Sequence, residues 1–272
     1  MSTPRGTATT SVAFEKARAD GRAALVGYLP AGFPDVQGSI DALHAMVEAG
    51  CDVIEVGLPY SDPVMDGPTI QAAAQQALEA GTRTADVLRV VEAVAATGTP
   101  TVVMTYWNPV ERYGVDAFAR DLANAGGAGL ITPDLVPDEA HGWIAAADAH
   151  RLDRVFLVAP SSTDARLRMT ADACRGFCYA AAVMGVTGAR ESSSDLAAPL
   201  VARVRAVGDV PVAVGIGVSD GDQAAEVARF ADGVIVGSAF VRRLLDAGSD
   251  RAAGLSSLAE LTRDLADGVR RA

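Results

Sequence analysis

The sequence predicts an α/β protein of the (β/α)8 class, the TIM barrel, and three observations support this fold. The chain has 272 residues, of which 50% are hydrophobic and 21% are charged, so it is long enough to bury a large core. Short apolar runs alternate with Ala-rich amphipathic stretches at a spacing of roughly 25–30 residues, which suits a barrel of ordinary size. Many of these runs are apolar throughout, as in a parallel sheet covered on both faces. We therefore expect a single domain over residues 1–272.

The expected elements follow in chain order. Strands are expected at Ala24–Tyr28, Val53–Leu58, Thr101–Tyr106, Gly129–Thr132, Val155–Ala159, Phe177–Ala182, Val212–Ile216 and Gly233–Val236. Helices are expected at Val36–Ala49, Thr69–Ala80, Ala85–Ala95, Val115–Ala125, Asp138–Ala149, Asp164–Cys174, Asp195–Ala206, Gln223–Phe230 and Leu255–Arg271. An extra helix at Val12–Ala19 is placed to cover the barrel floor, and residues 1–10 are expected to be disordered. An open doubly wound sheet is the alternative, but Tyr28–Gly32 lacks the Gly-rich turn that binds dinucleotides.

The net charge, the N-terminal sequence and the cysteines limit which classes of protein are expected. Thirty-four acidic and 23 basic side chains give a net charge of −11, which disfavours binding to nucleic acid or to an anionic membrane. The N-terminus has no apolar signal segment, and no apolar run approaches the roughly 20 residues of a membrane span. Cys51, Cys174 and Cys178 lack metal-ligand spacing and are expected to be reduced thiols. We therefore expect a cytoplasmic protein.

Several catalytic chemistries are excluded by which residues are missing. Lys16 is the only lysine and precedes the first strand, so a Schiff-base mechanism is excluded. All three histidines, His44, His141 and His150, fall in helical patterns, which disfavours a His-ligated metal or a His-based triad. We expect no metal and no cofactor, so that catalysis depends on carboxylates and phenols.

Two carboxylates lie where such a barrel carries its active site, at the carboxyl ends of the strands. Glu55 is inside the second expected strand, where burial would raise its pKa and suit it to proton transfer near neutrality. The alternative is a buried ion pair with an arginine. Asp66 lies in the loop that follows, just before Pro68. A helix beginning at Pro68 would give Asp66 the alternative role of a helix cap.

Glycine-rich strand ends are candidates for a phosphate site. Gly188, Gly215–Gly217 and Gly237-Ser238 follow the sixth, seventh and eighth expected strands. Gly237-Ser238 leads into a short helical segment, Ala239–Leu244, whose first backbone N–H groups would attract a phosphate without a lysine. The alternative is that these are only tight turns. In the sixth strand, Tyr179 is either a hydrogen-bonding group at the mouth or core filler.

Several segments resemble the signature of the tryptophan synthase alpha chain family. The most specific block is EVGLPYSDP at residues 55–63 with DGPTIQ at residues 66–71. The other matching segments are YLPAGFP at 28–34, MTYWNP at 104–109 and GVTG at 185–188. The resemblance extends over nearly all of residues 20–272.

The resemblance implies an enzyme that splits indole-3-glycerol phosphate into indole and glyceraldehyde 3-phosphate with no cofactor of its own. It implies that Glu55 is the acid/base, that Asp66 faces the indole nitrogen and that Tyr179 lines the pocket. The positions that match the family's loop-closing threonine and its phosphate-binding residues are Thr187, Gly188, Gly217, Gly237 and Ser238. The implied partner is a pyridoxal-phosphate beta chain, in an assembly of two alpha and two beta chains.

The chain departs from the family's sequence at one place, and two alternative functions remain open. Enterobacterial members carry Arg-Ser where this chain has Val183-Met184, so we expect loop closure to depend on other groups such as Arg190. One alternative is a regulatory subunit with negligible chemistry of its own. The other is a different phosphate-binding barrel enzyme, such as a sugar-phosphate isomerase.

Overall fold

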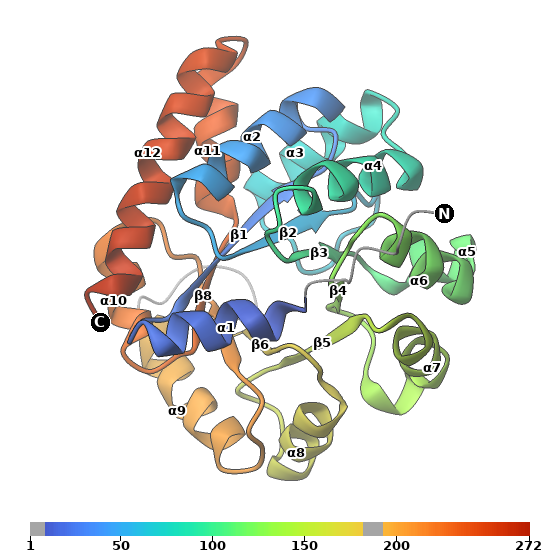
Figure 1. Ribbon diagram of the computed structural model, residues 1–272, viewed down its shortest axis with the longest axis vertical. Helices are drawn as coiled ribbons and strands as arrows, with labels where there is room; N and C mark the ends of the chain where they lie inside the picture. The colour runs from blue at the N-terminus through green and yellow to red at the C-terminus, as the bar shows by residue number, and fades with distance from the viewer. Residues whose placement is uncertain (1–8, 182–192) are drawn as a thin grey trace.

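The computed structural model describes residues 9–181 and 193–272, which form a closed barrel of eight parallel strands (Figure 1). The strands are β1 (Ala24–Pro30), β2 (Val53–Gly57), β3 (Thr101–Met104), β4 (Gly129–Thr132), β5 (Asp153–Val158), β6 (Cys178–Ala181), β7 (Val212–Gly215) and β8 (Gly233–Val236). Each strand pairs with the next one in the sequence, and β8 pairs with β1 to close the ring. The closed ring confirms the expected fold class and rules out the open doubly wound sheet.

Helices surround the barrel and connect its strands (Figure 1). They are α1 (Thr10–Ala19), α2 (Val36–Ala49), α3 (Pro68–Glu79), α4 (Thr84–Ala95), α5 (Trp107–Tyr113), α6 (Val115–Asn124), α7 (His141–His150), α8 (Asp164–Ala173), α9 (Ser193–Arg205), α10 (Gly221–Ala228), α11 (Ser238–Ala247) and α12 (Arg251–Arg270), with a short 3-10 helix η1 (Pro137–Glu139) before α7. No helix in these described ranges is long and apolar enough to cross a membrane.

The apolar strands bury side chains on both faces. In β2, Val53 packs with the residues that fill the barrel, whereas Ile54 and Val56 pack in the layer between the strands and the helices. This two-sided burial explains why the strand runs are apolar throughout rather than alternating. The interior side chains are Val26, Val53, Val102, Ile131, Val155, Phe177, Ala213 and Ile235.

Helix α1 covers the floor of the barrel, as the sequence predicted, and lies across the strands in Figure 1. The rings of Phe14 and Phe177 are 5.1 Å apart. Thr10, which we expected to be disordered, is instead the buried first residue of α1. Its backbone N–H and its hydroxyl each donate to the Asp153 carboxylate at 2.7 Å, which explains why the helix starts two residues before Val12. Residues 1–8 lie outside the described residues.

The main difference from the expected elements follows β3. The sequence predicted a strand as far as Tyr106, but β3 ends at Met104 and the unexpected helix α5 begins at Trp107. Pro109 is tolerated in this helix because it lies in the first turn, where backbone N–H groups have no partner within the helix. Tyr106 is therefore the N-cap residue of α5 rather than part of a strand, and this change places it beside the candidate site.

Candidate active site

Glu55 lies at the centre of β2 and faces the inside of the barrel. It shares its face of the strand with Val53 and Gly57, because successive side chains of a strand point to opposite sides. Its register partner in β1 is Tyr28, which places the two side chains next to each other. Only 1% of Glu55 is exposed.

The Glu55 carboxyl is buried without the charge that would neutralise it. Burial, and to a smaller extent the negative charge of Asp66, raise its pKa from 4.5 to about 8. Among the residues that the structure describes, its Oε2 has no hydrogen-bond partner. No arginine in the described part of the chain forms an ion pair with Glu55, which argues against the buried ion pair that the sequence left open. At neutral pH, Glu55 is predominantly a protonated acid.

Asp66 is held over the cavity by the loop between β2 and α3. Burial raises its pKa, and a hydrogen bond from the Tyr106 hydroxyl opposes that change. The same Tyr106 oxygen accepts the backbone N–H of Met65 at 2.9 Å. Gln71 donates to the Asp66 carbonyl oxygen at 2.7 Å and fixes the end of the loop. The loop is thus held by one group from α3 and one from the β3–α5 connection.

The structure decides between the two roles that the sequence left open for Asp66. Helix α3 begins at Pro68 with Gly67 as its N-cap, and no side chain caps it. Asp66 is therefore not a helix cap, and its carboxylate is available to the cavity.

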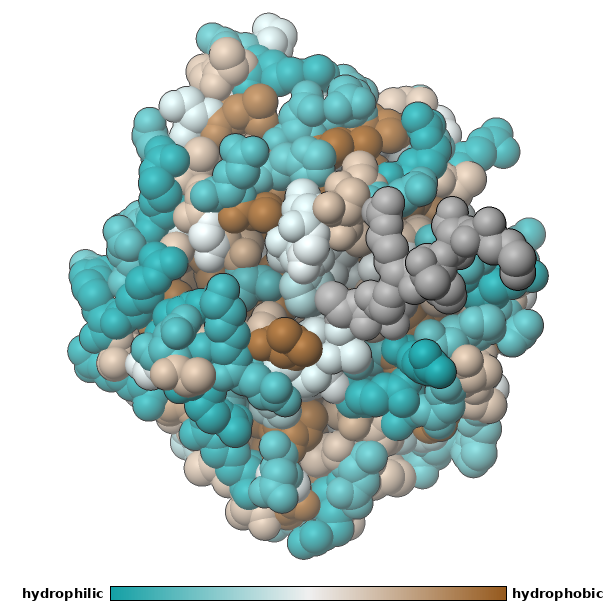
Figure 2. Space-filling model, in the orientation of Figure 1, coloured by the Kyte–Doolittle hydropathy of each residue, from teal (hydrophilic) through white to brown (hydrophobic). Residues whose placement is uncertain are grey.

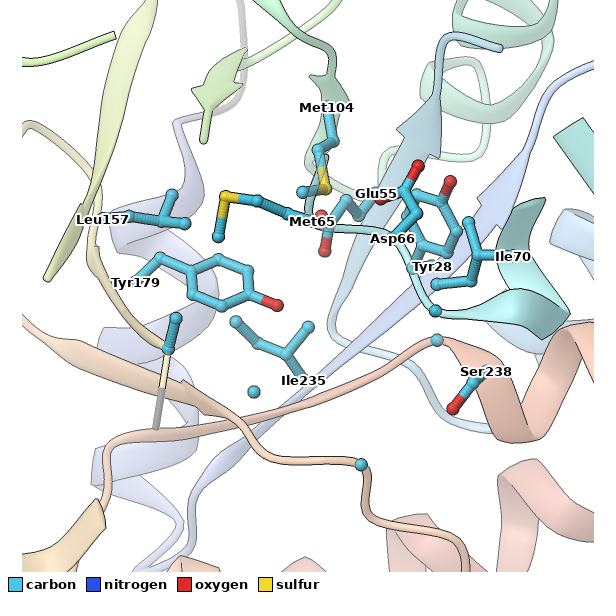
Figure 3. Close-up of a pocket in the computed structure, with 15 residues that line it drawn as sticks. Tyr28, Glu55, Met65, Asp66, Ile70, Met104, Leu157, Tyr179, Ile235 and Ser238 are labelled. Atoms are coloured by element: carbon cyan, nitrogen blue, oxygen red, sulfur yellow. The ribbon is translucent and has the colours of Figure 1, made fainter. Parts of the chain in front are cut away.

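The cavity lies at the carboxyl ends of the strands (Figure 3). It is lined by Tyr28, Glu55, Met65, Asp66, Gly67, Ile70, Met104, Leu157, Tyr179, Ala181, Gly215, Gly217, Ile235, Gly237 and Ser238. In Figure 3 the Tyr179 hydroxyl points toward the side of the cavity where Glu55 and Asp66 lie. Six of the eight predicted site residues are therefore brought together, and Thr187 and Gly188 lie outside the described residues.

Two glycines make room for the tyrosines of the cavity. A Cβ at Gly215 would lie 2.4 Å from the Tyr179 hydroxyl oxygen, and a Cβ at Gly57 would lie 2.3 Å from the Tyr28 hydroxyl oxygen. Burial raises the pKa of both tyrosines, and the charges of Glu55 and Asp66 add to the effect. Both phenols therefore stay protonated and act as neutral hydrogen-bonding groups.

The candidate anion site lies at the edge of the cavity where α11 begins. Ser238 is the first residue of α11, and Gly237 precedes it as the N-cap. Gly217 has φ +83°, a backbone conformation that glycine adopts readily. None of the described residues lining the cavity is basic. Backbone N–H groups at the start of α11 are then the available donors for a phosphate.

Sequence reasoning missed several residues of the site; the most informative are Tyr28, which lines the cavity, and Tyr106, which bonds to the loop that carries Asp66. Tyr28 is two residues after Val26 on the inward face of β1, so the period of two was the signal that could have found it. Tyr106 could not be found in this way because it was assigned to a strand. Among the described residues, no group of three or more His, Cys, Asp or Glu side chains could hold a metal ion.

The arrangement places two carboxyls, those of Glu55 and Asp66, within one cavity that has an apolar wall. Glu55 can donate a proton at neutral pH, and Asp66 can stabilise positive charge nearby. Tyr28 and Tyr179 supply hydroxyl groups, and Met104, Leu157 and Ile235 supply an apolar wall for a flat ring. The site thus suits acid–base chemistry on an aromatic compound that carries a phosphate.

Comparison with known proteins gives one consistent result. A sequence model of the tryptophan synthase alpha chain family matches residues 14–270. A tryptophan synthase alpha chain of Salinispora tropica is 68% identical over 259 residues, covering 95% of this chain and 97% of that one. A chain of tryptophan synthase from M. tuberculosis in its open form is 57% identical with a TM-score of 0.89, covering 97% of this chain and 100% of that one. A mutant tryptophan synthase alpha-subunit from Pyrococcus furiosus is 33% identical with a TM-score of 0.81, covering 90% and 98%.

Proposed function

This chain belongs to the tryptophan synthase alpha chain family, and we propose that it cleaves indole-3-glycerol phosphate with Glu55 as the proton-transfer residue. The reaction is a carbon–carbon lyase reaction of tryptophan biosynthesis that yields indole and glyceraldehyde 3-phosphate. The observation that carries the assignment of Glu55 is its buried carboxyl inside the cavity, with a pKa of about 8 and an Oε2 atom that no described residue hydrogen-bonds. A group of this kind both donates and accepts a proton near neutral pH.

The first step is proton transfer to the indole ring. The Glu55 carboxyl gives its proton to C3, and the ring becomes an iminium-like cation. Asp66 stabilises the positive charge that develops at the ring N–H, which it faces as a carboxylate. A carboxylate in a low-dielectric cavity does this far more strongly than one in water.

The second step breaks the carbon–carbon bond. Glu55, now a carboxylate, accepts the proton of the side-chain hydroxyl next to the ring. The electrons of that O–H bond form the aldehyde carbonyl, and the electrons of the broken C–C bond return to the ring as in a retro-aldol reaction. Glu55 ends protonated, and the products are neutral indole and the aldehyde. The protonated ring thus takes the place of a lysine imine or a metal as the electron sink.

The phosphate is proposed to bind where α11 begins, at Gly237 and Ser238, with Gly217 nearby. Gly188 belongs to the same proposed site, and Thr187 is proposed to help close it. Binding energy from this remote group holds the reacting carbon beside Glu55.

Replacing Glu55 with Gln tests the assignment in single-turnover experiments on indole-3-glycerol phosphate. Glu55→Gln should keep substrate binding but lose roughly 10²–10⁴ in the rate of indole release, the usual contribution of a positioned acid or base. Glu79→Gln, which changes an exposed carboxylate of α3, is the matched control and should release indole at the original rate. Indole release by Glu55→Gln at the original rate would remove Glu55 from the mechanism. Indole release by the original chain argues against a silent regulatory subunit.

We propose further that the chain works with a pyridoxal-phosphate beta chain, as two alpha and two beta chains, in the cytoplasm. Four of the six exposed large apolar side chains in the described residues support a partner surface: Val64, Met65, Tyr113 and Val136. All four lie in segments that follow three neighbouring strands of the barrel, β2, β3 and β4. The face seen in Figure 2, which carries α1, shows hydrophobic side chains only as separate spots. An exposed apolar patch is typical of a binding surface, and we propose that these four side chains form one.

Replacing one of these side chains tests the partner proposal. Val136→Asp should weaken binding of a tryptophan synthase beta chain about tenfold or more, as loss of an interface anchor does. Leu196→Asp is the matched control, because Leu196 is half exposed but lies in α9, away from this surface. Titration calorimetry gives the affinity, and the mass of the complex gives its stoichiometry. Equal affinities for the two variants would contradict this surface.

A further inference from the structure

Two of the three cysteines meet at the start of β6, outside the cavity. Cys174 follows the last residue of α8, and Cys178 is the first residue of β6. The Cys174 sulfur is 4.0 Å and the Cys178 sulfur 3.8 Å from the same atom, the carbonyl oxygen of Phe156 in β5. Both thiols therefore lie beside the same carbonyl group of β5. All three cysteines are unpaired, and Cys51 is buried before β2.

The segment between the two cysteines holds them in this arrangement. Arg175 exchanges two backbone hydrogen bonds with Arg154 of β5, at 3.0 and 2.9 Å. Gly176 has φ +94°, and a Cβ there would lie 2.3 Å from the Thr10 hydroxyl oxygen. The turn is therefore anchored to the barrel on two sides. Two sulfurs that lie within 4.0 Å of one atom can be joined by a local shift of the turn that carries them.

We propose that Cys174 and Cys178 are an oxidisable pair, which a hydroperoxide converts to an intramolecular disulfide that slows the reaction of the barrel. In the first step the Cys174 sulfur attacks one peroxide oxygen and the O–O bond breaks. Cys174 becomes a sulfenic acid, and one water leaves when the oxidant is hydrogen peroxide. In the second step the Cys178 sulfur attacks the Cys174 sulfur, the S–O bond breaks, and a second water carries away the Cys178 proton. Two thiols are oxidised, and one peroxide is reduced to two waters.

The exposure of the two thiols sets the order of these steps. Cys174 is partly exposed, whereas Cys178 is buried. The neighbouring Cys174 thiol and burial hold the pKa of Cys178 well above its usual range, so Cys178 stays protonated and protected. The oxidant therefore reaches Cys174 first, and Cys178 is the thiol that completes the disulfide.

The disulfide would act on the cavity through β6. Cys178 directly precedes Tyr179, whose ring lines the cavity and whose register partner is Leu157. A bond that draws Cys178 toward the end of α8 displaces the backbone one residue from Tyr179. We expect the oxidised chain to release indole about tenfold more slowly, because small displacements of positioning side chains are costly to catalysis.

The experiment treats the purified full chain with hydrogen peroxide, unfolds it in iodoacetamide and measures its intact mass. The number of alkylated cysteines should fall from three to one, with Cys51 still labelled and a peptide map joining Cys174 to Cys178. Dithiothreitol should restore both the labels and the rate of indole release. Cys174→Ser and Cys178→Ala are the variants, and neither should form the disulfide or lose activity reversibly.

Three outcomes would overturn the proposal. The first is retention of three alkylated cysteines after oxidation of the original chain. The second is oxidation of Cys174 to sulfinic or sulfonic acid without any disulfide. The third is a disulfide that leaves indole release unchanged, which would refute the coupling to Tyr179. The mass measurement on the original chain keeps the test decisive even if a variant fails to fold.

Discussion

Replacing Glu55 with Gln should change how the stability of the fold depends on pH. The Glu55 carboxyl is buried, with a pKa raised from 4.5 to about 8. In the unfolded chain the same carboxyl returns to its ordinary pKa. Between these two values the unfolded chain has released the proton and the folded chain still holds it. The stability that the protonated carboxyl contributes is therefore fully present below about pH 4.5 and is lost as the pH rises through about 8.

The two pKa values give the size of the effect. Integrating the difference in bound protons from about pH 5 to about pH 9 gives a loss of about 4 kcal/mol in the free energy of unfolding. Gln cannot ionise, so the Glu55→Gln variant does not suffer this loss. Its own packing changes stability by the same amount at every pH. The difference between the two proteins should thus grow by about 4 kcal/mol in favour of the variant across this range.

Urea unfolding of both proteins at a series of pH values measures this difference directly. The change in the midpoint at constant slope reports the free energy. The control is Glu79→Gln, which removes an exposed carboxylate and should keep a constant offset from the original chain. A constant offset for Glu55→Gln as well would refute the conclusion that this carboxyl is buried, protonated and unpaired in the folded protein.

Three further predictions concern the cavity. The kcat/KM of the original chain should fall as the pH rises above about 8, where Glu55 loses its proton. In the Asp66→Asn variant this alkaline fall in kcat/KM should move to lower pH, because the negative charge of Asp66 is one cause of the raised pKa of Glu55. Tyr106→Phe removes the hydrogen bond that lowers the pKa of Asp66, so the acidic limb of the same profile should move to higher pH. Gly215→Ala places a Cβ 2.4 Å from the Tyr179 hydroxyl oxygen, so it should lower the free energy of unfolding, measured with urea, by about 1–3 kcal/mol. Adding Tyr179→Phe, which removes that oxygen, should restore part of this stability.

The sequence was sufficient to predict where the barrel strands lie and which strand ends carry the chemistry. Strands buried on both faces leave continuous apolar runs, and a carboxylate inside such a run, like Glu55, must be buried on either face. The burial of Glu55 follows from that pattern alone. Its pKa does not, because the value depends on whether an arginine or a hydrogen-bond donor reaches the carboxyl from another strand.

The remaining parts of the site depend on contacts between distant segments. Tyr106 fixes the loop that carries Asp66, 40 residues earlier in the chain, and the pattern around it indicated a strand rather than the start of a helix. The role of Asp66 was open for the same reason, since the sequence places it next to Pro68 but does not say that Gly67 is the N-cap. The apolar side chains at the mouth, such as Val136, are likewise recognisable only when their exposure is known.

The burial that makes Glu55 useful also makes the fold less stable at the pH where the enzyme works. The only lysine, Lys16, lies in α1 at the floor of the barrel, so no amine is available at the mouth to form an imine with the substrate. One carboxyl must then act as the acid and, after giving up its proton, as the base. An exposed carboxyl would be ionised at neutral pH and could not begin the reaction. Keeping Glu55 protonated at pH 7 costs the fold about 3 kcal/mol. A variant selected for stability alone would therefore be expected to lose this carboxyl first.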